Sequence, residues 1–133
     1  VRLVGSEMCI RDRSDYVQTA NDHTLLVVLI EDIVAVRNLD EILSVDHIDV
    51  FFVAPTDLAA SMGHMDNTGH PEVQKVIDDA LARIQSRGRV AGALANDGNV
   101  AKYAAAGVQF LLTSVGPWIA NGAHAFMERA KNV

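Results

Sequence analysis

The sequence predicts an α/β fold built on a parallel sheet. Four times in succession, a short apolar run is followed by a polar turn and then by a segment whose apolar residues keep helical spacing. The apolar runs are rich in β-branched residues and read as strands buried on both faces. Alternating strands and helices imply right-handed crossovers between parallel neighbours. Four such units make either a small open α/β domain, which the length alone favours, or half of an eightfold barrel, which the residues at the strand ends favour.

The first unit begins with a strand over residues 25–30. Asp32 is placed to cap the following helix, whose apolar positions run from Val36 to Leu43 at helical spacing. The second strand covers residues 48–53 and is ended by Pro55. A short helical turn follows, with Thr56 as its candidate cap, and a loop spans residues 63–69.

The third and fourth units repeat this order. A long helix is expected over residues 72–87, with Pro71 suited to its first turn and Gly88 after its end. A strand over 90–94 leads to a helix that Asp97 can cap and Gly107 can close. The last strand covers 108–112, and the last helix runs from about Pro117 to Lys131.

The bulk composition limits the class of protein. The chain has 133 residues, 50% of them hydrophobic and 21% charged, which is ordinary for a globular domain. The formal net charge of −6 argues against nucleic acid or an anionic membrane as the partner. No apolar run approaches the roughly 18–20 residues of a membrane span, and no signal-peptide pattern is present. The single cysteine fits a reducing compartment, so the cytoplasm is the expected location.

The first thirteen residues differ from the rest. Segment 1–13 keeps neither a helical nor a strand period, and residues 8–13 resemble the translation of a transposon-end sequencing adapter. We expect this segment to be non-native, with residues 14–133 as the true coding part of a longer protein, and we give Cys9 no functional weight. The alternative is a natural disordered N-terminus.

Acidic residues follow the first two strands. Ligands of parallel α/β folds lie beyond the carboxyl ends of the strands, where Glu31 follows the first strand and Asp57 the second. Neighbouring parallel strands lie about 4.8 Å apart, so the two carboxylates can share one ion. Two carboxylates and water suit Mg²⁺ or Mn²⁺, which would leave positions open for a 2-oxo acid and stabilise an enolate. The alternative is that both residues merely complement the N-terminal dipole of the helices they precede.

Several ordered blocks resemble the HpcH/HpaI aldolase family. They are Leu29-Ile30-Glu31-Asp32, then Asn38 to Leu43, then Ile48 to Leu58 with Met62-Gly63, then His70 to Val73. The likeness covers nearly the whole chain from Asp15, and matching gaps between several blocks make it specific. This resemblance implies a (β/α)8 TIM barrel, of which the chain would supply the C-terminal half, units five to eight.

The resemblance also implies the site. It makes Glu31 and Asp57 the metal ligands and Mg or Mn the cation. Pyruvate would bind along Ala54, Pro55, Thr56 and Asp57, with its carboxylate on the backbone N–H groups of the last two. The implied reaction is reversible cleavage of a 4-hydroxy-2-oxo acid to pyruvate and an aldehyde, in a homo-oligomer. The family's Arg and its His base would lie in the first half of the barrel, so we assign no catalytic residue here.

Some positions depart from the family pattern. Ala54 stands where many members have Gly, and Leu29 where some have Gln or Met. After the fourth strand, Ser114 and Gly116 replace the Gly and Asp of some members. We expect His64 and His70 to lie on the active-site rim, solvated.

Three other functions remain open from the residues. A citrate-lyase β-type enzyme would cleave acyl-CoA-linked substrates, but the Pro-x-Asp-Leu block favours the aldolase branch. A receiver domain needs a Lys after its last strand, where Thr113 and Ser114 stand. A half-barrel that binds a metal or an oxo acid without catalysis is the third alternative.

Overall fold

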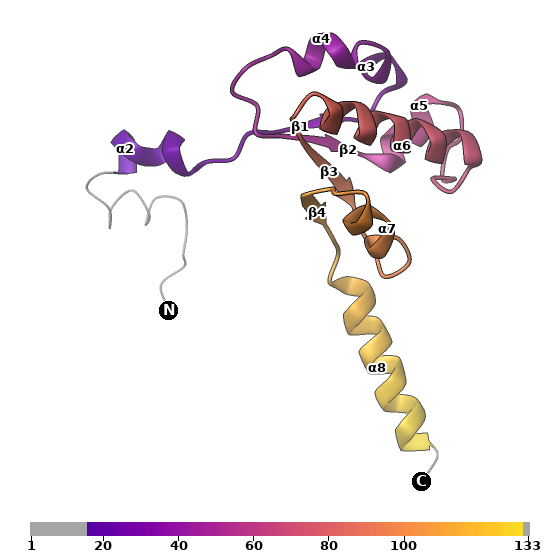
Figure 1. Cartoon of the computed structure of the whole chain (residues 1–133). Helices are drawn as coiled ribbons and strands as arrows, with labels where there is room; N and C mark the ends of the chain where they lie inside the picture. The colour runs from indigo at the N-terminus through magenta and orange to yellow at the C-terminus, as the bar shows by residue number, and fades with distance from the viewer. Residues whose placement is uncertain (1–15, 132–133) are drawn as a thin grey trace.

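A computed structural model describes residues 16–131 (Figure 1). Segment 1–13 therefore lies outside the described residues. The elements, in chain order, are α2 (Tyr16–Thr19), η1 (Ala20–His23), β1 (Val27–Ile30), α3 (Ile33–Arg37), α4 (Leu39–Leu43), β2 (Val50–Val53), α5 (Pro55–Ser61), α6 (Pro71–Ser86), β3 (Val90–Leu94), α7 (Val100–Ala105), β4 (Phe110–Leu112) and α8 (Gly116–Lys131).

The four strands form one parallel sheet in the order β1-β2-β3-β4. Each strand therefore pairs with the next strand along the chain. In this register, Leu29 lies beside Phe52, Phe52 beside Gly92, and Gly92 beside Phe110. The predicted parallel α/β sheet is confirmed, and β1 and β4 are its two edges.

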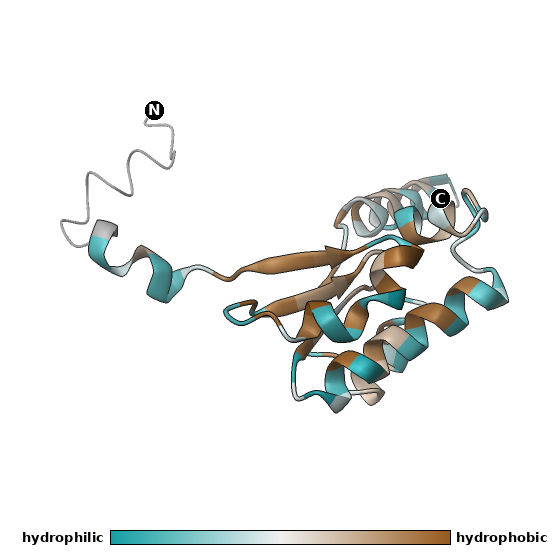
Figure 2. Ribbon diagram, turned by 90° about the horizontal axis from the view of Figure 1, so that it is seen from above, coloured by the Kyte–Doolittle hydropathy of each residue, from teal (hydrophilic) through white to brown (hydrophobic). Residues whose placement is uncertain are grey.

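The core lies on one face of the sheet. Alternate strand residues, such as Ile30, Phe51 and Ala93, join the buried cluster that the helices complete. Helix α6 contributes the largest share of that cluster, with a helical stripe that includes Val73 and Ile84. Figure 2 shows the strands largely hydrophobic and the helices banded with polar residues.

The opposite, open face of the sheet is exposed at its two edge strands, whereas Val50 and Phe52 at its centre are buried. Leu29 on β1 is 54% exposed and Leu112 on β4 is 51% exposed. Between them, Phe52 and Phe110 meet edge to face, with ring centroids 6.2 Å apart. In a closed barrel, this face would be the interior.

The single helix expected after Asp32, with apolar positions from Val36 to Leu43, is in fact two helices. Helix α3 ends at Arg37 and α4 begins at Leu39, with Asn38 between them. The Val36 carbonyl near this break accepts a hydrogen bond at 3.0 Å from Arg83 on α6. The same Arg83 also bonds Asp40 at 3.2 Å. The break is therefore held by a side chain from a distant part of the sequence.

Two of the three predicted caps are wrong. Asp32 does cap α3, since its carboxylate accepts from the Val34 N–H at 2.6 Å. Thr56 does not cap α5: the N-cap position falls on Ala54, which has no side-chain oxygen to accept a bond. For α7 the N-cap residue is Asn99 rather than Asp97, because an Asn96 turn delays the helix.

Helix α8 extends away from the rest of the structure (Figure 1). None of its residues is buried. Its exposed apolar side chains include Trp118, Ile119, Phe126 and Met127. Within residues 16–131, no helix is both long enough and apolar enough to span a membrane.

Candidate functional site

The carboxyl ends of β1 and β2 carry the two predicted metal ligands. Glu31 directly follows β1, and Asp57 is the third residue of α5, which follows β2 after one residue. The Ala54 N–H donates to the Ile30 carbonyl at 3.1 Å, so the strand pairing continues one step beyond the sheet. Continuing the register places Glu31 opposite Ala54, on the same open face as Leu29. Both acidic residues therefore belong to the same end of neighbouring strands.

A side-chain hydrogen bond ties the two segments together. The Ser61 hydroxyl, at the end of α5, accepts from the Ile33 N–H at 3.0 Å and donates to the Leu58 carbonyl at 2.8 Å. It thus links the start of α3, two residues after Glu31, to the helix that carries Asp57. The sequence offered no signal for this contact, because the two partners lie 28 residues apart.

Neither predicted ligand has a structural partner in the described part of the chain. Glu31 is half-buried and Asp57 is exposed, and neither makes an ion pair or a side-chain hydrogen bond with another described residue. Two other carboxylates, Asp32 beside Glu31 and Asp49 at the opposite end of the strands, do have hydrogen-bond partners. Asp32 caps α3, and Asp49 accepts from the Leu26 N–H at 2.7 Å. The helix-capping role therefore falls to Asp32 and leaves the Glu31 carboxylate available.

Backbone donors lie beside these carboxylates. The first bond within α5 runs from the Leu58 N–H to the Ala54 carbonyl, at 3.3 Å. The N–H groups of Thr56 and Asp57 come before it and have no acceptor within the helix. Pro55, at the first helical position, has no N–H to offer. The two free donors can bind an anionic group at this end of the sheet.

A cavity occupies the same rim further along the sheet. It has a volume of about 320 Å³ and lies between the ends of β3 and β4 and the start of α8. Leu94, Ser114 and Trp118 are among its lining residues. The Trp118 indole N–H donates to the Asp97 carboxylate at 2.9 Å, which joins α8 to the loop after β3.

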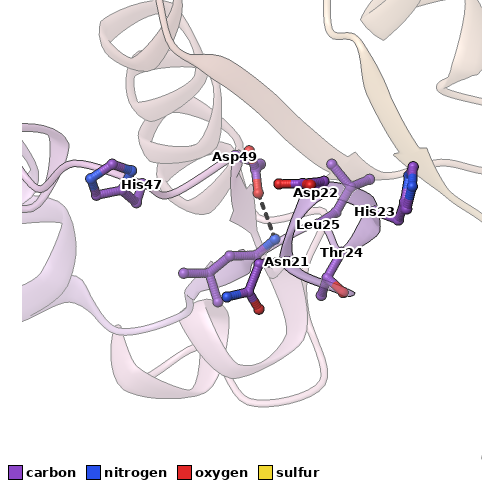
Figure 3. A pocket seen from close by; sticks show the side chains of 8 residues that line it. Asn21, Asp22, His23, Thr24, Leu25, His47 and Asp49 are labelled. Atoms are coloured by element: carbon purple, nitrogen blue, oxygen red, sulfur yellow. Dashed lines mark hydrogen bonds between the residues drawn. The ribbon is translucent and has the colours of Figure 1, made fainter. Parts of the chain in front are cut away.

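A larger hollow lies at the opposite end of the strands (Figure 3). Its volume is about 640 Å³, and its lining includes His23, His47 and Asp49. On one side it is bounded by η1, which has no buried residue. Ligands of parallel sheets bind beyond the carboxyl ends of the strands, so we place the chemistry at the other rim despite the smaller cavity there.

A second group of side chains able to bind a metal lies in the loop between α5 and α6 and in the first turn of α6. His64, His70 and Glu72 each present a ligand atom within 4.8 Å of the other two. From the sequence alone, both histidines are expected on the active-site rim, exposed to solvent. Their spacing, five residues between the histidines and one before the glutamate, was the available signal, but only the path of the loop brings them together.

The site lies in a fold shared with known aldolases. A solved HpcH/HpaI aldolase/citrate lyase family protein from Burkholderia cenocepacia superposes with a TM-score of 0.81 at 28% identity, over 98% of this chain and 53% of that one. The structural relatives have a TIM-barrel-like fold, and this chain matches about half of it. The predicted fold class is therefore confirmed.

Curated relatives are aldolases. A hydroxypyruvate/pyruvate aldolase from Roseovarius nubinhibens is 45% identical over 105 residues, which is 78% of this chain and 41% of the relative. A 2-keto-3-deoxy-L-rhamnonate aldolase from Salmonella paratyphi B is 45% identical over 102 residues, 76% of this chain and 38% of the relative. This chain thus spans less than half the length of either one. The family model of HpcH/HpaI aldolase/citrate lyase matches residues 3–116, and the chain belongs to that family.

Proposed function

We propose that this chain carries the metal-binding rim of a divalent-metal-dependent aldolase. The reaction is the reversible cleavage of a 4-hydroxy-2-oxo acid to pyruvate and an aldehyde. The observation that carries the proposal is the pair Glu31 and Asp57: two carboxylates without a structural partner, at matching ends of adjacent strands, beside free backbone donors. The aldolase names of the curated relatives support the same reaction class.

The donor set of this rim fits a hard cation. Carboxylate oxygens and water are the ligands that Mg²⁺ and Mn²⁺ prefer, and Glu31 and Asp57 would supply the carboxylates. A cation held there would act as a Lewis acid on the 2-oxo group and stabilise the enolate of pyruvate.

The residues around the carboxylates would hold the substrate. The N–H groups of Thr56 and Asp57 are suited to the pyruvate carboxylate, with Ala54 and Pro55 forming the backbone beside it. Ala54 stands where many members of the family have Gly, so its methyl group would reduce the space for a ligand there. In the cleavage direction, a base takes the proton of the 4-hydroxyl group, the bond between C3 and C4 breaks, and its electron pair enters the enolate. We assign no residue of this chain as that base.

The oligomeric state, the partners and the cellular location are also proposals. We infer a homo-oligomer, because α8 has no buried residue and the inner face of the sheet is open. Small 2-oxo acids and aldehydes are the partners, and the net charge of −6 disfavours nucleic acid and membranes. With Cys9 set aside, residues 14–133 contain no cysteine and therefore no disulfide, which fits a cytoplasmic location. We take residues 14–133 as the aldolase part and segment 1–13 as foreign; sequencing the locus from unfragmented DNA tests that boundary.

Metal binding tests the proposal without requiring turnover. In a titration with Mn²⁺, monitored by calorimetry, Glu31→Gln and Asp57→Asn should each weaken binding by at least about tenfold, since each removes a charged ligand. The matched control is Asp32→Asn, which removes a neighbouring carboxylate but keeps a good helix cap. Unchanged Mn²⁺ affinity in both ligand variants, or an equal loss in the control, would contradict the assignment.

A further inference from the structure

Three side chains of metal-ligating type meet where α5 leads into α6. His64 belongs to this loop, His70 is the N-cap residue of α6, and Glu72 lies in the first turn of that helix. One ligand atom of each lies within 4.8 Å of the other two. We propose that His64, His70 and Glu72 bind one transition-metal ion of the Zn²⁺ type, independently of the carboxylate pair.

The spacing of the ligand atoms is close to that of a coordinated ion. The His64 Nε2 atom lies 3.1 Å from the Glu72 Oε2 atom. In a tetrahedral zinc site with bonds of about 2.0–2.1 Å, two ligand atoms lie about 3.3 Å apart. His64 and Glu72 therefore already stand at the separation that one shared ion requires. The His70 ligand atom, which lies within 4.8 Å of the other two, has at most about 1.5 Å to approach to complete the set.

The imidazole rings must leave their present stack. Their centroids are 3.7 Å apart and their planes differ by 17°, so their in-plane lone pairs run side by side rather than converge. Rotation of a ring about its Cβ–Cγ bond would change the direction of its lone pairs, and this rotation has a broad energy minimum.

Ligation by His70 replaces a weak helix cap. The His70 Nδ1 atom accepts from the Glu72 N–H at 3.3 Å, a long hydrogen bond. A neutral ring that accepts at Nδ1 carries its proton on Nε2, so either nitrogen can bind a metal only if this bond is given up. Glu72 is exposed, and water can satisfy its N–H group instead.

The loop holds the histidine backbones in place. The His64 N–H donates to the Ala59 carbonyl at 2.8 Å, and the His64 carbonyl accepts from Asn67 at 3.0 Å. The His70 N–H donates to the Asn67 carbonyl at 3.1 Å, and the His70 carbonyl accepts from Gln74 at 3.0 Å. Both peptide groups of both histidines are thus fixed before an ion arrives, so binding costs little backbone entropy.

The donor set selects the metal. Two imidazole nitrogens and one carboxylate favour Zn²⁺ and Co²⁺ over the harder Mg²⁺ and Mn²⁺. The side chain of Glu72 is 72% exposed and that of His64 is 24% exposed, so water has access to a fourth position. This preference is opposite to that of Glu31 and Asp57, and the two sites can be told apart by metal.

The test is a titration of the whole chain with Co²⁺, followed by its visible absorption, and then displacement by Zn²⁺. We expect one Co²⁺ per chain, with the intense band of a four-coordinate ion. His64→Gln and His70→Asn should each weaken binding by at least about tenfold, since even partners outside the ligand shell change metal affinity by that much. Asn at position 70 keeps a capping side chain, so a loss of metal in that variant is not a loss of the helix.

The controls separate this site from the proposed aldolase site. His124→Gln removes an exposed histidine of α8 and should leave Co²⁺ binding unchanged. The double variant Glu31→Gln, Asp57→Asn should keep the Co²⁺ band while losing Mn²⁺, and His64→Gln should do the reverse. Absence of the band in the wild-type chain, its survival in both histidine variants, or an equal loss in the control would overturn the assignment.

Discussion

Gly92 is the residue where the sheet has the least room for a side chain. A Cβ atom at this position would lie 2.9 Å from Phe52 Cδ2, 3.1 Å from Val50 Cγ1 and 3.2 Å from Phe110 Cδ1. Gly92→Ala should therefore separate the two phenyl rings and lower the free energy of unfolding by about 1–3 kcal/mol. Urea denaturation measures the change. Gly122→Ala is the control: the added methyl group meets nothing within 4 Å in α8, so it should be neutral or stabilise by up to about 1 kcal/mol.

The helix caps show which single-residue features can be predicted from the sequence. Asp32 could be predicted as a cap because it stands directly before the helix and its oxygen needs to reach only two residues. Thr56 and Asp97 have side chains equally suited to capping a helix. However, α5 begins at Pro55 and α7 begins at Val100, so neither residue occupies the N-cap position. At α5 the extended residue before the first turn is Ala54, so the cap position has no polar side chain. The residue type identifies the candidate N-caps, but the local backbone angles determine which residue occupies the N-cap position.

At the scale of elements, α7 carries a titratable group in the core. Tyr103 is 4% exposed, and this burial raises its pKa above the ordinary value of about 10; Lys102 opposes the shift and Asp78 adds to it. The folded state thus disfavours the phenolate. The stability that Tyr103 contributes is full below about pH 10 and is lost as the pH rises through the folded-state pKa.

This linkage gives a measurable pH dependence. The free energy of unfolding should fall more between about pH 8 and pH 11 in the wild-type chain than in Tyr103→Phe, which has no proton to lose. Both proteins keep the ion pair between Lys102 and Asp78, so its alkaline loss cancels in the comparison. Equal slopes of stability against pH in the two proteins would show that Tyr103 is not the group responsible.

Helices and strands could be predicted where neighbouring residues in the sequence determine them. The strands follow from apolar runs, and α6 from its stripe, Pro71 and Gly88, which has a φ of +69°. The break at Asn38 and the group of His64, His70 and Glu72 were not predictable. The first depends on Arg83, 47 residues from the carbonyl it binds, and the second on the path of an irregular loop. The carboxylate pair lies between these cases, because strand order alone places both residues at one rim.

For the whole molecule, we expect the chain alone to self-associate and to lack aldolase turnover. The edge strands β1 and β4 can form hydrogen bonds with a strand of another copy, and the open face between them can pack against its apolar surface. Leu29→Glu should shift the chain toward monomer in sedimentation velocity. Val34→Glu is the matched control, since both side chains are 54% exposed but Val34 lies on α3.

Turnover is measured as pyruvate–aldehyde addition with Mg²⁺ or Mn²⁺. We expect none, because the rim offers the proposed metal ligands and anion donors, and no described residue is assigned as the base. A monodisperse monomer with activity that Glu31→Ala abolishes would contradict both expectations.

The strand order also bears on how the molecule assembles during synthesis. Every hydrogen-bonded neighbour in the sheet is the next strand along the chain. A nascent polypeptide can therefore add each β-strand and its helix to a template that has already left the ribosome, without waiting for a distant partner. Each addition of a strand requires only a short loop to close. Further strand–helix units can be added in the same way at either end of the sheet. Duplication or fusion of such half-barrels would leave the existing strand pairs unchanged, since only the terminal strands gain neighbours.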